Sequence, residues 1–165
     1  MNLKRALKHL FTPAWVVRRT FTPQDLSRIE AAVAASEKRH RGEIRFAVEG
    51  ALDFLPVARG MTPRARALQV FSLLRVWDTE ENTGVLLYLQ LVDRDIEIVA
   101  DRGIAHRIEQ VEWDAICRRM EQAFGAGRYE DGVLSGIAEV SDVLARHFPA
   151  GAENVDELPD APAVL

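Results

Sequence analysis

The sequence predicts a three-layer α/β/α sandwich around a small mixed β-sheet. Residues 84–92 form an almost continuous apolar run, which is typical of a strand buried on both faces. Two other segments, 43–49 and 95–100, alternate apolar and polar side chains as half-buried strands do. Segments with helical periodicity precede, separate and follow these three strands.

The order of the strands follows from the segments that connect them. Strands 43–49 and 84–92 are separated by a predicted helix, so they should form a parallel βαβ unit with a right-handed crossover. Only Asp93 and Arg94 separate the second strand from 95–100, which predicts a hairpin and an antiparallel third strand. Because the central run must be buried on both faces, we expect helices on both sides of the sheet.

Four long helices are expected around these strands. They are predicted over residues 22–39, 62–74, 112–124 and 129–147. The first begins at Thr22 and Pro23, where the threonine hydroxyl can cap free amides, and Asp25 completes an approximate capping box. Residues 50–60 are expected to form a loop, and residues 102–110 a connector with room for one helical turn.

The first 20 residues carry five basic side chains and no acidic one. Apolar side chains recur there at helical spacing, at Leu3, Ala6, Leu7 and Leu10. This pattern predicts a short basic amphipathic helix, and two interpretations of it stay open. The helix either packs on the domain's own surface, or docks on a membrane surface or a partner. The repeated Phe-Thr-Pro at 11–13 and 21–23 predicts two successive helix starts.

Composition excludes several classes of function. The net charge of −4 argues against a nucleic-acid-binding domain, which usually has a basic face. The single cysteine, Cys117, excludes an internal disulfide and a multi-cysteine zinc site, and its apolar neighbours predict a core position. No apolar run reaches the roughly 20 residues that cross a bilayer, and no secretory signal is recognised. We therefore expect a cytoplasmic protein without a transmembrane segment.

We divide the chain into three parts. Residues 1–21 form the basic arm, residues 22–148 form one α/β/α domain, and residues 149–165 form a tail that contains prolines. The tail carries acidic side chains and no base from residue 151 onward: Glu153, Asp156, Glu157 and Asp160. It is expected to be either disordered or laid along the surface of the domain. Its charge is opposite to that of the arm, so the two segments meet each other or bind different partners.

Polar residues should gather where the first two strands begin. Because these strands are parallel, Glu43 and Gly84 start at the same edge of the sheet, and the hairpin returns Asp101 to it. The predicted ligands of a Ca²⁺ or Mg²⁺ ion at this edge are Glu43, Asp78, Glu80, Glu81, Asn82 and Asp101. Arg102 and Gly103 follow as candidate phosphate- or cofactor-binding residues. The competing interpretation is an ordinary solvated turn.

Several motifs in the same order resemble those of the TPM domain, a family named for thylakoid-lumen, photosystem-repair and receptor-modulator proteins. They are the segments 42–44, 65–74, 82–87, 93–94, 101–104 and 129–133, with a tail segment at 157–160 as in the compact, stand-alone bacterial form. The resemblance covers roughly residues 22–148. It implies an α/β/α fold, and it carries two activities described for relatives, phosphatase activity in a plant protein and binding of calcium or other divalent metals.

Two functions therefore stay open. The first is an interaction module that binds a divalent cation and an unidentified protein partner near membranes. The second is a weak metal-dependent phosphatase, in which Asp78, Glu80, Glu81 and Asp101 hold the ion and Arg102 contacts the phosphate. The sequence predicts no catalytic nucleophile, since it has no Walker-type loop, no EF-hand spacing and no metal-binding histidine pair.

Overall fold

The computed structural model describes residues 3–151 and 156–165, so the acidic Glu153 of the tail lies outside the described residues. The helices and strands are α1 (Leu3–Leu10), α2 (Val16–Thr20), α3 (Pro23–Glu37), β1 (Glu43–Glu49), α4 (Phe54–Ala58), α5 (Pro63–Leu73), β2 (Gly84–Gln90), β3 (Asp95–Ala100), α6 (Arg102–Ala105), α7 (Gln110–Gly125), α8 (Tyr129–His147) and β4 (Ala163–Val164). The long helices and the first three strands follow the predicted order. Helix α4 lies in the segment predicted as a loop, and β4 lies in the tail.

The four strands form one mixed sheet in the order β3-β2-β1-β4. As predicted, β1 is parallel to β2, and β2 is antiparallel to β3. Strand β2 ends at Gln90 rather than at residue 92, because residues 91–94 form the turn and Arg94 has a φ of 57°. Strand β4 adds a short parallel edge to β1, so the tail joins the sheet.

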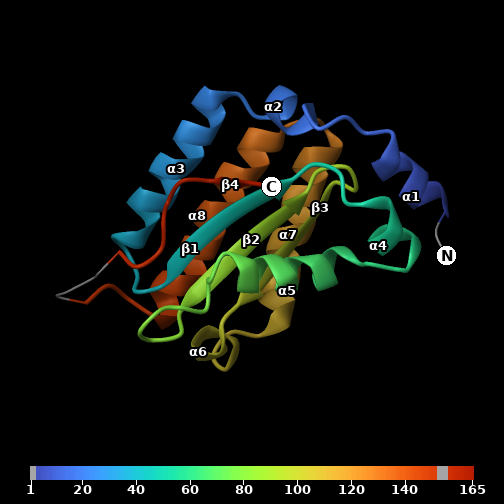
Figure 1. Cartoon of the computed structure of the whole chain (residues 1–165). Coiled ribbons are helices and arrows are strands. Elements are labelled where there is room, and N and C mark those ends of the chain that lie inside the picture. The colour runs from blue at the N-terminus through green and yellow to red at the C-terminus, as the bar shows by residue number, and fades with distance from the viewer. Residues whose placement is uncertain (1–2, 152–155) are drawn as a thin grey trace.

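Helices cover both faces of the sheet, which confirms the three-layer sandwich. Figure 1 shows α7 and α8 on one side of the strands and α5 on the other. On the first side, Ile44 and Phe46 of β1 share the larger apolar core with Val140 of α8. On the side of α5, a smaller core contains Tyr88, and the tail contributes Leu158 to it.

The two Phe-Thr-Pro segments have different roles. Thr22 caps α3 as predicted: its hydroxyl accepts a hydrogen bond of 3.2 Å from the Asp25 amide, and the Asp25 carboxylate accepts one of 2.7 Å from the Thr22 amide. The Thr12 hydroxyl instead donates to the Lys8 carbonyl at the end of α1. Helix α2 begins only at Val16, so the prediction of a helix start at the first segment is wrong.

Helix α1 packs on the domain through the side that carries Ala6 and His9, and Ala6 joins a small apolar cluster with Val57 of α4. Ala6 and His9 are buried, while Leu3, Leu7 and Leu10 are exposed. The Arg5 guanidinium pairs at 2.7 Å with Asp93, in the turn between β2 and β3, and this long-range ion pair fixes which side of the helix faces inward. The helix therefore lies on the domain, as the first interpretation predicted, with its leucines turned away from it. Within the described residues, the basic arm and the acidic tail form no ion pair with each other.

Two exclusions made from composition can be compared with the structure. Among residues 3–151 and 156–165, no helix combines the length and the apolar character that a membrane span requires. Cys117 packs against the larger core, and burial raises the pKa of its thiol to about 12, although the Ile98 amide donates to the sulfur. A thiol that stays protonated is a poor nucleophile, so Cys117 has a structural role.

Candidate functional site

The beginning of β1 and the end of β3 lie at the same end of the sheet. Glu43 is the register partner of Gly84, and the Asp101 amide donates a hydrogen bond of 2.8 Å to the Gly84 carbonyl. Strand β2 lies between them, and strands two places apart are separated by about 10 Å. Glu43 and Asp101 thus lie at the same end of the sheet, on opposite sides of the central strand.

Two glycines allow the loop before β2 to close over this edge. A Cβ atom at Gly84 would lie 1.9 Å from the Val76 carbonyl oxygen, and one at Gly103 would lie 2.6 Å from the carbonyl oxygens of Glu81 and Asn82. The Gly103 amide donates to the Asn82 carbonyl, and Asn82 has a left-handed φ of 55°. Gly103, predicted to bind a cofactor, lets the backbone of α6 approach the backbone of the loop before β2.

Arginines pair with three of the predicted metal ligands. The Arg41 guanidinium donates to both carboxylate oxygens of Glu81, at 2.6 and 2.8 Å. The Arg102 guanidinium donates to the Asn82 side-chain oxygen at 3.0 Å. Arg75 lies 3.8 Å from Asp78. These guanidinium groups neutralise the loop and would repel a cation placed among its side chains.

Asp101 differs from these loop residues because it is buried. One of its carboxylate oxygens accepts a hydrogen bond of 2.7 Å from the Arg102 amide and so caps α6. Its other oxygen, Oδ2, is buried and has no hydrogen-bond partner within the part of the chain that the structure describes. Among the six predicted ligands, Asp101 therefore keeps a buried oxygen that could still accept a bond.

Glu43 and Glu80 both bind the acidic tail. The Glu43 carboxylate accepts hydrogen bonds from the amides of Glu157 and Leu158, at 3.2 and 3.1 Å. The Glu80 amide donates to the Glu157 carboxylate at 2.8 Å. Arg45, two residues along β1, donates to the carbonyls of Pro159 and Ala161. The tail is therefore laid along the domain over its described residues 156–165, which was one of the two predicted alternatives.

The tail completes a group of carboxylates that the sequence did not predict. A surface hollow of about 290 Å³ is lined by Glu37, Glu43, Asp156 and Asp160, with Ala34 and Lys38. We call it the acidic hollow. One oxygen from each of Glu37, Asp156 and Asp160 lies within 4.8 Å of the other two. Within the described residues, no other set of three acidic, histidine or cysteine side chains is gathered this closely.

Three separate segments build the acidic hollow. Glu37 is the last residue of α3, Glu43 is the first residue of β1, and both aspartates come from the tail. The Glu37 carboxylate accepts a hydrogen bond of 2.8 Å from the Ile44 amide, which joins the helix end to the strand. Sequence reasoning missed Glu37 because a glutamate at the end of a helix is usually solvated. The available signal was the acidic tail segment 156–160.

Burial controls the electrostatics of the acidic hollow. Glu37 is only 7% exposed, and this desolvation raises the pKa of its carboxyl to about 9, despite the hydrogen bond from Ile44. Burial also raises the pKa of Glu43, although the hydrogen bonds that it accepts from two tail amides lower it. Lys38 is the one basic side chain among the described residues that line the hollow. The hollow thus gathers four carboxyl groups beside one lysine, and the buried Glu37 retains its proton at neutral pH.

Comparison with known proteins identifies the family. The chain is similar to the BA42 protein from the psychrophilic bacterium Bizionia argentinensis, solved by NMR, with a TM-score of 0.77 and 28% identity over 87% of this chain and 94% of that one. Comparison with curated proteins gave no match. The family profile described as "TPM domain" matches residues 17–143. The chain therefore belongs to the TPM domain family, as the resemblance of its motifs predicted.

Proposed function

We propose that this TPM domain is a binding module that holds one divalent cation, calcium or magnesium, in the acidic hollow. The observation that carries the proposal is the approach of three carboxylate oxygens, from Glu37, Asp156 and Asp160, to within 4.8 Å of one another. Calcium ligands lie about 2.3–2.6 Å from the ion, so oxygens around it are separated by up to about 5 Å. Glu43 lines the same hollow and can complete the set.

The acidic hollow suits a cation better than the loop predicted from the sequence. Glu81, Asn82 and Asp78 are each beside an arginine. Glu37 instead has a buried carboxyl that burial keeps protonated, and an ion that displaces this proton would stabilise the charged form in place of the lost solvation. The buried oxygen of Asp101 supports the loop site as a second candidate, so the experiment includes Asp101.

A cation in the hollow would act on the tail. Asp156 and Asp160 belong to the tail, while Glu37 and Glu43 belong to the domain, so a shared ion would join the two segments. The tail contributes Leu158 to the smaller core and β4 to the sheet. We therefore propose that the bound ion stabilises the attachment of the tail to the domain.

Thermal unfolding of the chelator-stripped chain tests the proposal. A ligand that binds only the native state raises the free energy of unfolding by RT ln(1 + [L]/Kd), about 2.7 kcal/mol at a hundredfold excess over Kd. We expect Ca²⁺ or Mg²⁺ at millimolar concentration to raise the melting temperature, and Glu37→Gln and Asp160→Asn to remove the rise. Asp101→Asn should keep it. Glu30→Gln is the matched control, since Glu30 is an exposed glutamate on the same helix.

The outcomes separate the two candidate sites. No rise with any of Ca²⁺, Mg²⁺ and Mn²⁺ would overturn the cation proposal as a whole. A rise that survives Glu37→Gln but not Asp101→Asn would move the ion to the loop. The same samples should be given a phosphate monoester, because Arg102, the predicted phosphate-binding residue, lies beside Asp101 and Asn82. Metal-dependent turnover that disappears together with the stabilising effect would make the chain a phosphatase; turnover in all variants would indicate a contaminant.

We also propose that the module works at the cytoplasmic face of a membrane, beside a membrane-associated protein. The basic first 20 residues and the exposed leucines of α1 support this placement. The test is flotation of the purified chain with native membrane vesicles, before and after protease treatment of the vesicles. Binding that the protease abolishes would support a protein partner, and absence of binding to any vesicles would overturn the placement.

A further inference from the structure

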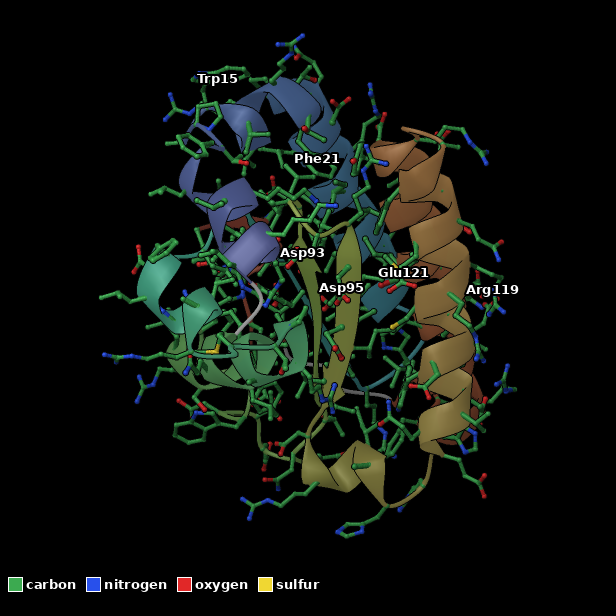
Figure 2. The ribbon with its side chains drawn as sticks, turned by 90° about the vertical axis from the view of Figure 1, so that its right-hand side faces the viewer. Trp15, Phe21, Asp93, Asp95, Arg119 and Glu121 are labelled. Carbon is green, nitrogen blue, oxygen red and sulfur yellow. The ribbon has the colours of Figure 1, made fainter. Side chains whose placement is uncertain are left out.

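Helix α1 presents its apolar side chains to solvent. Leu3, Leu7 and Leu10 follow one another at spacings of four and three residues, which places them along one stripe of the helix. Two large apolar side chains follow the helix in the chain and are also exposed, Phe11 at 79% and Trp15 at 54%. We call these five residues the N-terminal patch. Figure 2 shows Trp15 at the outside of the molecule, whereas Phe21, at the end of α2, points inward.

The opposite side of α1 explains why this patch is not needed for packing. His9 is buried, and its ring accepts a hydrogen bond from the Leu52 amide at 2.9 Å through Nδ1. Its other ring nitrogen lies 3.2 Å from the Asp93 carboxylate, which also binds Arg5. These polar contacts, together with the buried Ala6 in its apolar cluster with Val57, fix the helix to the domain. The patch is presented already folded, so a partner does not have to supply the free energy of helix formation.

The charge around the N-terminal patch is positive. Lys4, Arg18 and Arg19 are exposed and belong to none of the ion pairs among the described residues. The Arg19 guanidinium lies 5.5 Å from the ring of Trp15. The first 20 residues contain no acidic side chain, although the chain as a whole carries −4. This local excess of positive charge favours an anionic partner.

From these observations we propose that the N-terminal patch docks directly on an anionic lipid bilayer. Leucine, phenylalanine and tryptophan beside lysine and arginine are the composition of helices that lie in the membrane interface. Tryptophan suits the level of the headgroups, and lysine and arginine are attracted to the negative surface. The inference deepens the membrane placement proposed above by naming the lipid surface itself as the ligand, and it does not depend on the cation.

A second copy of the chain fits this patch less well. Pairing of two identical patches would bring Lys4, Arg18 and Arg19 of both copies together, and like charges across an interface are unfavourable. A bilayer that contains anionic lipids provides both an apolar layer and negative headgroups. Helix α1, which carries the three leucines of the patch, lies at the outside of the fold (Figure 1).

Flotation with protein-free vesicles tests the proposal, in the presence of a chelator so that the acidic hollow takes no part. We expect the full chain to float with vesicles of phosphatidylcholine mixed with phosphatidylglycerol, and less with phosphatidylcholine alone. Leu7→Asn and Phe11→Ser should each lower partitioning about tenfold, because burial of one such side chain changes an equilibrium by that factor or more. Arg18→Gln with Arg19→Gln should lower it about fivefold per charge at low salt.

Leu73→Asn is the matched control, because Leu73 is 63% exposed at the end of α5 and outside the patch. It should float as the unmodified chain does, and all variants should keep its melting temperature. No flotation with anionic vesicles, or equal flotation of Leu7→Asn, would overturn lipid docking. Binding only to native membranes, lost after protease treatment, would overturn it too and leave the proposed protein partner. A dimer in solution that Leu7→Asn dissociates would assign the patch to a second copy instead.

Discussion

His9 and Asp93 join the first helix to the hairpin, 84 residues further along the chain. The buried ring of His9 lies 3.2 Å from Asp93 through Nε2 and accepts the Leu52 amide through Nδ1. Since Nδ1 accepts a hydrogen bond, the ring is neutral and its proton is on Nε2, directed at the carboxylate. Protonation of Nδ1 would break the bond from Leu52, so we expect the attachment of α1 to weaken as the pH falls.

Burial lowers the pKa of His9 below its usual 6.5, against the attraction of Asp93. The folded chain thus binds fewer protons than the unfolded chain once pH falls below about 6.5, so stability should decrease from there towards acid pH. His40, whose pKa burial lowers to about 4, should act in the same direction. Protonation of Glu37 acts in the opposite direction over the same range, so the measured quantity is the difference between two chains. As the pH decreases from 6.5, the melting temperature of the unmodified chain should fall relative to that of His9→Gln.

The control for this prediction is His106→Gln, since His106 is exposed. It should reproduce the pH dependence of the unmodified chain. If His9→Gln also reproduced it in full, the contact of His9 with Asp93 and Leu52 would not be the source of the acid sensitivity. The pH dependence that persists in His9→Gln is expected from His40 and Glu37, which act in opposite directions.

The central sheet could be predicted from the sequence because its signals are local. The alternation in β1 and β3 gave both strands at their observed bounds, and the apolar run predicted burial of β2. Strand β4 could not be predicted, because Ala163 and Val164 are two residues whose pairing depends on the edge of β1. The exposed face of α1 is also a long-range effect, since Asp93 and Leu52 determine it.

The candidate site was predicted in part for the same reason. Strand direction alone places Glu43 and Asp101 at one edge of the sheet. The groups that bind the Glu43 carboxylate come instead from the tail, whose path depends on the Leu158 contact and the hydrogen bonds to Glu43 and Arg45. A sequence pattern contains no information on such contacts, so the carboxylates of Glu37 and Asp160 were not predicted as partners.

Glu37→Gln should stabilise the metal-free chain at neutral pH. Burial raises the pKa of Glu37 from 4.5 to about 9, so the folded state holds a proton that the unfolded state releases above about pH 4.5. Stability is therefore full below pH 4.5 and decreases as pH rises towards 9. Glutamine removes this loss, on the order of 3 kcal/mol near pH 7, and its side-chain oxygen can still accept a hydrogen bond from the Ile44 amide.

Denaturant unfolding at several pH values in the presence of a chelator measures this effect. Glu30→Gln, on the exposed side of the same helix, should leave both the stability and its pH dependence unchanged. A Glu37→Gln chain less stable than the unmodified one at neutral pH would show that the carboxyl is ionised and compensated by its surroundings.

Leu158→Ala should release the tail. Leu158 is 6% exposed and packs with Ala47 and Leu86 on the α5 side of the sheet. Its truncation should cost about 2 kcal/mol in the free energy of unfolding, at the low end for a buried leucine because the site lies at the edge of the core. Hydrogen exchange should increase at the Leu165 amide, which donates to the Val48 carbonyl.

The control for the tail is Leu165→Ala, because this C-terminal leucine is 39% exposed. It should change stability by less than about 0.5 kcal/mol. If Leu158→Ala left both stability and hydrogen exchange unchanged, the tail would be held by its backbone hydrogen bonds alone, and Leu158 would not be its anchor.

Gly84→Ala should be the most damaging single-methyl addition at the site. The new Cβ would lie 1.9 Å from the Val76 carbonyl oxygen, so the loop before β2 would have to move and the Asp101 amide bond to Gly84 would be disturbed. We expect the free energy of unfolding to decrease by about 3 kcal/mol or more, at the upper end for overpacking.

Gly125→Ala is the matched control: no atom lies within 4 Å of its new Cβ at the end of α7, and it should stabilise the chain by about 0.5 kcal/mol. Melting curves of the two variants should therefore shift in opposite directions, and equal shifts would refute the close contact at Gly84.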